Sequence, residues 1–264
     1  MSKTGQARVL TPAQFSVLLD VIKDHRHPEK NTALIQVSFS LGLRVQEIAL
    51  LQIKEVAELG PSNSGQRSFK LKEILALPAS YTKGANASGR SKSNYQRRRV
   101  AFSLFQFDQV VSQIETLAKA GLEVNPEQFY PQVTEHRGKS RDLPMSDPWL
   151  RDALIEHLQV RLAQDPTASM TDPLFLSQKG GPYSPNTLQE HFRVIQRRWA
   201  GIERASSHSG RRTLLTNIIQ DTKSVKAAQK IAGHISAATT LIYEEPSEES
   251  MKDALSGAGR KFNK

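Results

Sequence analysis

Cysteine is absent from this chain of 264 residues. Its absence excludes a disulfide scaffold, a thiolate metal site and a cysteine nucleophile, and it is consistent with a reducing compartment. No long apolar run is present, so the sequence predicts no membrane span, and the polar N-terminus lacks the apolar stretch of a signal peptide. We therefore expect a cytoplasmic protein that has no membrane partner.

Acidic residues are outnumbered by basic ones, with 26 Asp and Glu against 36 Lys and Arg, which gives a net charge of +10. Such a balance favours a polyanionic partner, most simply nucleic acid. Residues 83–99 hold no acidic residue and are rich in Gly and Ser, which predicts a basic loop. A solvated loop is one interpretation of it and contact with DNA phosphates is the other, through Arg90, Lys92, Arg97, Arg98 and Arg99.

Apolar periodicity predicts a mostly α-helical fold with a small antiparallel β-sheet. Gly60 to Gly65 is expected to be a surface loop. Strands are expected over 69–77, 100–103 and 141–145. Helices are expected over 12–22, 31–41, a short stretch from 44, then 104–120, 147–162, 185–199, 208–220, 224–232 and 236–243.

Four short pieces of sequence stand out, in the order Leu41-Gly42-Leu43-Arg44-Val45-Gln46-Glu47-Ile48, His208-Ser209-Gly210-Arg211-Arg212, Ile231-Ala232-Gly233-His234 and Tyr243. Each alone has an ordinary explanation, such as a solvated surface arginine or a tyrosine that packs on the core. Together they resemble the Gly-Leu-Arg-x-x-Glu box, the His-x-x-Arg box, the Gly-His dipeptide and the following tyrosine of the tyrosine recombinase, or phage integrase, family. The resemblance covers about residues 11–250.

The resemblance implies that residues 1–250 form a tyrosine recombinase-like catalytic domain, with a basic hairpin and loop region inserted at about 60–140. Residues 251–264 would form a C-terminal tail. The family usually has a helical core-binding domain upstream of the catalytic domain, and Arg44 lies too near the N-terminus for one. We therefore expect either a short form or a fragment.

The family's chemistry is cleavage and rejoining of DNA strands through a 3′-phosphotyrosine, which would form here on Tyr243. Arg44, Arg211 and His234 would stabilise the phosphate, because guanidinium groups match the charged non-bridging oxygens of the transition state. His208 would assist proton transfer, and Glu47 is expected to support an arginine. No cofactor or metal is expected, since the arginines take the place of a metal's charge.

The lysine that protonates the leaving 5′ oxygen in the family has two candidates here. Lys83, in Thr82-Lys83-Gly84, lies near the usual distance after Arg44 and is preferred. Lys139 lies in a segment that resembles the return strand of the family's hairpin, although Arg137 occupies the position most like the lysine there.

The resulting hypothesis is a site-specific recombinase or integrase of a mobile element. Its expected partners are double-stranded DNA, further copies of itself in a tetramer on DNA, and an accessory DNA-bending protein. Bound to DNA, it would lie in the nucleoid. The alternatives are a DNA-binding regulator that retains the fold without catalysis and a DNA-relaxing enzyme similar to type IB topoisomerases.

Overall fold

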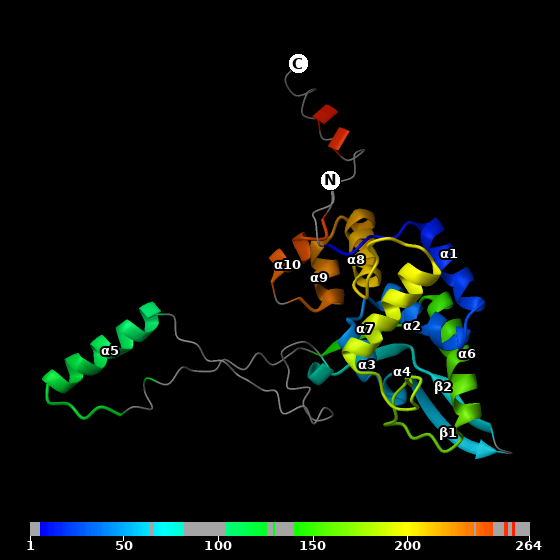
Figure 1. Cartoon of the computed structure of the whole chain (residues 1–264), viewed down its shortest axis with the longest axis horizontal. Helices are drawn as coiled ribbons and strands as arrows, with labels where there is room; N and C mark the ends of the chain where they lie inside the picture. Colours follow the sequence, from blue (N-terminus) through cyan, green and yellow to red (C-terminus); the bar gives the residue numbers. More distant parts are fainter. Residues whose placement is uncertain are drawn as a thin grey trace.

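Helices pack around one buried helix, α2 (Pro28–Leu41), in the computed structural model of the chain, which describes residues 6–63, 66–81, 104–125, 129, 140–234, 236–244, 251–252 and 255–256 (Figure 1). The N-terminal helices and strands are α1 (Pro12–Lys23), α3 (Val45–Leu50), α4 (Ile53–Val56), β1 (Ala57–Asn63), β2 (Gln66–Leu71), β3 (Ile74–Leu77) and the 3₁₀ turn η1 (Ala79–Tyr81). The later ones are α5 (Leu104–Lys119), β4 (Arg141–Pro144), α6 (Pro148–Gln164), α7 (Pro185–Arg193), η4 (Val194–Trp199), α8 (Ser209–Thr222), α9 (Val225–Ala232) and α10 (Ala237–Leu241). The prediction of a mostly helical fold with small antiparallel pairing is confirmed.

The strands form two antiparallel pairs, β1 with β2 and β3 with β4. The prediction of one strand over 69–77 is wrong, because the chain changes partner between β2 and β3. The Lys72 amide donates to the Val56 carbonyl at 2.8 Å, and the Glu73 carbonyl accepts from the Met145 amide at 2.8 Å. The expected surface loop at 60–65 is also partly wrong, since β1 continues to Asn63.

Helix α2 supplies the centre of the hydrophobic core and packs against both α6 and α8. Its residues Leu34, Ile35 and Val37 are fully buried, and so are Leu18 and Ile22 of α1. Each such side chain contributes about 1.5–3 kcal/mol to folding through burial alone. The core therefore fixes the ends of α2 and α8, from which part of the candidate site is built.

Gly42 ends α2 in the left-handed conformation, with φ of +61°. A Cβ at this position would lie 3.0 Å from Leu214 Cδ2 of α8, so both the conformation and the space favour glycine. The turn sends the chain back so that Arg44 becomes the N-cap of α3. The predicted break at Gly42 and new helix from Arg44 are thus confirmed.

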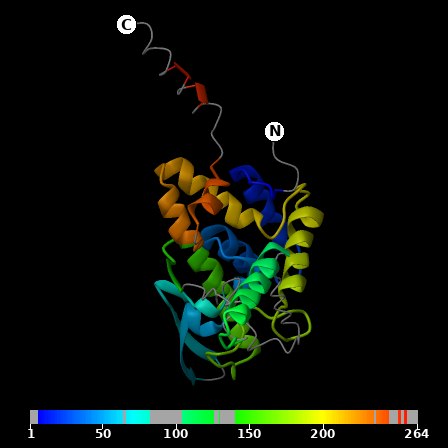
Figure 2. The ribbon, with the colours of Figure 1, turned by 90° about the vertical axis from the view of Figure 1, so that its left-hand side faces the viewer.

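Helix α5 lies within the expected insertion at 60–140, and the helix predicted over 104–120 is confirmed. It lies apart from the other helices in Figure 1, and in Figure 2 the molecule is turned so that α5 faces the viewer. Its apolar residues Phe107 and Val111 are 55% and 38% exposed. The expected strand at 100–103 and the whole of the basic loop at 83–99 lie outside the described residues.

The helix expected over 185–199 is present, but its last six residues form the π-helix η4. Ser184 caps its start, since its hydroxyl accepts from the Thr187 amide at 3.1 Å.

Within the described part of the chain, no helix is both long and apolar enough to cross a membrane.

His157 of α6 is buried beneath Phe175, and its ring stacks on that phenyl ring at 4.9 Å. Its Nε2 lies 2.9 Å from the Leu174 carbonyl, which can only accept, so Nε2 carries the proton. Desolvation lowers the pKa of His157 to about 4. The neutral form is therefore the one that packs in the core.

We predict that His157 makes folding sensitive to acid. Because its folded pKa lies below the unfolded value, stability is lost as pH falls from about 6.5 toward 4, at up to about 1.4 kcal/mol per pH unit. Urea unfolding at pH 7 and pH 5 should show a smaller loss in His157→Gln than in the wild type. An equal loss in the two proteins would contradict this prediction.

Candidate active site

Arg44 is held by the buried carboxylate of Glu47, one turn along α3. Glu47 Oε2 accepts from the Arg44 backbone amide at 2.8 Å, and Oε1 lies 3.1 Å from Arg44 Nη1. The Arg44 side chain is 25% exposed, whereas Glu47 is fully buried. The expectation that Glu47 supports an arginine is confirmed, and the guanidinium of Arg44 still reaches the surface.

Glu47 also holds a second arginine, Arg141, which begins β4. Arg141 Nη2 lies 2.7 Å from the same oxygen, Oε1, and Arg141 Nη1 donates to the Ile231 carbonyl at 2.7 Å. Sequence reasoning assigned no role to Arg141. Its presence in the predicted return strand was a signal, but its partners lie about 90 residues away on either side.

Arg211 of α8 is buried and links two other parts of the chain, the end of α2 and the end of α9. Its Nη1 donates to the Gly42 carbonyl at 2.7 Å, and its Nη2 donates to the Ala232 carbonyl at 2.6 Å. Desolvation, and then the charge of Arg44, lower the pKa of Arg211 to about 10, so it remains a cation at neutral pH. The two arginines of the predicted set therefore lie close enough to repel each other.

His234 follows Gly233, the left-handed C-cap of α9. Its Nε2 lies 2.9 Å from Arg211 Nη2, and its Nδ1 lies 2.9 Å from Thr240 Oγ1. Since a guanidinium can only donate, Nε2 must accept, and Nδ1 carries the proton that is donated to Thr240. Desolvation and the nearby arginines, Arg211 first, lower the pKa of His234 to about 4, so the ring is neutral at pH 7.

Tyr243 follows α10 and stacks on His234, with ring centroids 5.8 Å apart and planes 17° apart. Its carbonyl accepts from the Thr216 hydroxyl at 3.4 Å, and its ring packs against the small cluster of Leu215 and its neighbours. Tyr243 also acts electrostatically on Arg211. The tyrosine thus lies beside the histidine and the buried arginine of the predicted set.

His208 is the N-cap residue of α8, one turn before Arg211, and its side chain is exposed. The helix predicted over 208–220 is confirmed, and it begins at Ser209. The structure thus brings together Arg44, Arg211, His234 and Tyr243, with His208 at the start of the same helix as Arg211. Lys83, Lys139, Arg90, Lys92, Arg97, Arg98 and Arg99 lie outside the described residues.

Both candidate lysines are nevertheless connected to the same end of one strand pair. The β3–β4 ladder ends with Leu77 opposite Arg141. Lys83 follows Leu77 by six residues, and Lys139 precedes Arg141 by two. The chain therefore leaves the sheet toward both lysines at the end where Arg141 meets Glu47.

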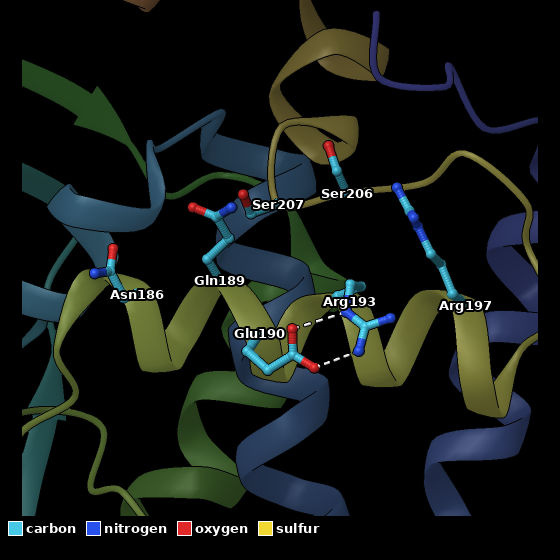
Figure 3. Close-up of a pocket in the computed structure, with 7 residues that line it drawn as sticks. All are labelled: Asn186, Gln189, Glu190, Arg193, Arg197, Ser206 and Ser207. Atoms are coloured by element: carbon cyan, nitrogen blue, oxygen red, sulfur yellow. Dashed lines mark hydrogen bonds and ion pairs between the residues drawn. The ribbon is translucent and has the colours of Figure 1, made fainter. Parts of the chain in front are cut away.

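A polar pocket of about 210 Å³ lies beside α7 and the segment that leads to His208. Figure 3 shows that Asn186, Gln189 and Glu190 line it from α7, and that Glu190 is paired with Arg193. Arg197, Ser206 and Ser207 complete its lining. Amides, hydroxyls and guanidinium groups suit a polar or charged ligand surface rather than an apolar small molecule.

Comparison with known sequences agrees with this geometry, because the Phage integrase family model matches residues 89–250, more than half of the chain. The chain belongs to the phage integrase family. Two curated relatives are named tyrosine recombinases. A XerC of Methylobacterium sp. is 32% identical over 121 residues, or 46% of this chain and 36% of the relative, and a XerD of Corynebacterium glutamicum is 29% identical over 142 residues, or 52% and 46%. The chain thus matches less than half the length of these relatives.

Solved structures of tyrosine recombinases share this phage integrase fold. A XerA recombinase aligns with a TM-score of 0.57 at 17% identity, covering 97% of this chain and 67% of that one. The Tn1549 transposon integrase in complex with transposon right end DNA aligns with a TM-score of 0.54 at 16% identity, covering 96% and 67%. At such identities the likeness concerns the fold alone.

We predict that Arg211 sets the protonation of His234 in this integrase-family site. In Arg211→Met the pKa of His234 should rise above about 4, because a nearby positive charge is removed, and stay below the ordinary value because burial remains. Nitrogen NMR of labelled histidine should show the Nδ1–H tautomer of the wild type at pH 7. Arg161→Met, far from the site, is the control, and an unchanged titration in Arg211→Met would contradict the prediction.

Proposed function

We propose that this protein cleaves and rejoins DNA strands by site-specific recombination, with Tyr243 as the nucleophile. The observation that supports this most is the meeting of Arg211, His234 and Tyr243 with Arg44 at one place, from four separate segments. The phenol oxygen can attack a phosphodiester, and the two guanidinium groups beside it can offset the negative charge of the phosphate.

In the proposed reaction, the Tyr243 hydroxyl oxygen attacks the phosphorus and the bond to the 5′ oxygen breaks. This leaves a 3′-phosphotyrosine and a free 5′ hydroxyl, and the reverse reaction with another 5′ hydroxyl rejoins the strand. Arg44 and Arg211 offset the charge that develops on the non-bridging oxygens. The phenol proton is lost to a base, for which the exposed His208 is the candidate.

His234 has a more specific role in this scheme. As a neutral ring whose Nε2 accepts from Arg211, it fixes the orientation of that guanidinium before DNA arrives. When a phosphate oxygen accepts the Arg211 Nη2 hydrogen bond in place of His234 Nε2, the histidine ring is free to rotate or to change tautomer. After either change, a ring N–H can point to the same phosphate and donate a hydrogen bond to it.

The biological context that we propose is integration or excision of a mobile element, with the strands of two sites brought together by a tetramer. The curated relatives named XerC and XerD favour site-specific recombination in general. The polar outer face of α7 beside the pocket, with Asn186 and Gln189, would contact the DNA.

Two other functions would use the same fold. A regulator without catalysis would bind DNA but form no covalent adduct. A topoisomerase-like enzyme would form the adduct but relax supercoiled DNA that carries a single site. The shared interactions of Arg211 with both His234 and Tyr243 favour a catalytic protein over the regulator.

We predict that Tyr243→Phe abolishes covalent adduct formation on a suicide DNA substrate while DNA binding remains. The change removes one oxygen and keeps the ring that packs against His234, so folding should be preserved. Denaturing gels detect the adduct, and Tyr183→Phe, a buried tyrosine elsewhere, is the matched control. Adducts that persist in Tyr243→Phe would exclude Tyr243 as the nucleophile.

We predict that the loss of activity in Lys83→Ala is restored by a 5′-phosphorothiolate substrate. A thiolate leaves without a proton, so this substrate bypasses the residue that protonates the 5′ oxygen. Cleavage rates of Lys83→Ala, Lys139→Ala and Arg137→Ala on both substrates distinguish the three candidates. Restoration of Lys139→Ala alone would transfer the role to Lys139.

A further inference from the structure

Arg141 is a buried charge beside the candidate site, with an exposed side-chain fraction of 5%. Its guanidinium pairs with Glu47 Oε1 and donates to the Ile231 carbonyl. Its aliphatic part lies so close to Gly233 that a Cβ there would stand 2.5 Å from Arg141 Cδ. The side chain is therefore fixed by two segments of the chain, the start of α3, which carries Arg44, and the end of α9, which leads to His234.

Arg44 and Arg141 share one oxygen of Glu47, so the two arginines compete for its negative charge. Glu47 Oε1 lies 2.7 Å from Arg141 but 3.1 Å from Arg44. The closer partner is also the buried one, where an ion pair is screened least by water. Arg44 is the partner with the more exposed side chain, at 25% against 5% for Arg141.

We propose that Arg141 is a positioning residue, which occupies the Glu47 carboxylate and so keeps the positive charge of Arg44 available to a DNA phosphate. This proposal rests on the proposed function. Without Arg141, the buried carboxylate has Arg44 as its remaining partner, and it draws that guanidinium inward and neutralises it. Arg141 is also the first residue of β4, two residues after Lys139. The charge that Arg44 presents therefore depends on the position of this strand.

Salt dependence of DNA binding tests this without any chemical step. In a Tyr243→Phe protein, each phosphate contact that is lost lowers the slope of log affinity against log salt by about 0.9. We expect Arg44→Ala and Arg141→Met each to lower the slope by up to that amount, and the double variant to lower it no further. Additive losses, or no loss in either single variant, would overturn the proposal.

A second background separates control of charge from simple support of the fold. In Glu47→Gln no carboxylate remains to neutralise Arg44, so adding Arg141→Met should leave the salt slope unchanged. Arg141→Lys keeps a cation beside Glu47 and should retain most of the slope, which also serves if Arg141→Met folds poorly. Loss of slope on adding Arg141→Met to Glu47→Gln would overturn the proposal.

The matched control is Arg161, which is equally buried and pairs with Asp165 at 3.2 Å on α6. Arg161→Met should lower the melting temperature without changing the salt slope. With Tyr243 intact, Arg141→Met should slow adduct formation about 10- to 100-fold. A wild type that forms no adduct would refute the proposed function alone, since the salt slopes still decide the role of Arg141.

Discussion

The fully buried carboxylate of Glu47 is the group on which the candidate site depends. A buried charge is costly unless it is paired and hydrogen-bonded, and Glu47 meets this requirement with hydrogen bonds from the Arg44 amide and guanidinium and an ion pair with Arg141. Those partners come from the start of α3 and the start of β4. The carboxylate therefore cannot be satisfied unless helix and strand are docked correctly, which couples assembly of the site to folding.

Most of the candidate residues lie at helix ends. Arg44 and His208 are N-cap residues, His234 follows the C-cap glycine of α9, and Tyr243 follows α10. At such positions the backbone leaves the helix axis, so neighbouring side chains from different helices can converge on one point. Arg211, within α8, is the exception, and its buried guanidinium fastens the ends of α2 and α9 to each other.

The sequence was sufficient to predict most helices, because their apolar spacing and their caps are local features. The break at Gly42, the N-cap at Arg44 and the support by Glu47 also follow from a few adjacent residues. The change of partner between β2 and β3 was missed, since the apolar residues on either side of Lys72 and Glu73 do not reveal which strand lies opposite each half.

Arg141 and Thr240 were missed for a related reason, which is that their roles exist only through contacts. Arg141 meets Glu47 and Ile231 across long stretches of sequence, and Thr240 matters because it accepts the Nδ1 proton of His234. A motif identifies residues that react, but the partners that fix their charge and tautomer are specified by packing. For the same reason, spacing alone favoured Lys83 and could not exclude Lys139.

The β3–β4 ladder joins segments that are separated by about 60 residues, from Pro78 to Ser140. The entropy lost in closing such a loop grows only with the logarithm of its length, so shortening it to about ten residues would save roughly 1.6 kcal/mol. Insertions and deletions between the strands are therefore nearly neutral for the Arg141–Glu47 contact at the end of the ladder. The chain can change the length of this segment, and what it carries, while Arg141 and its partner Glu47 keep their places.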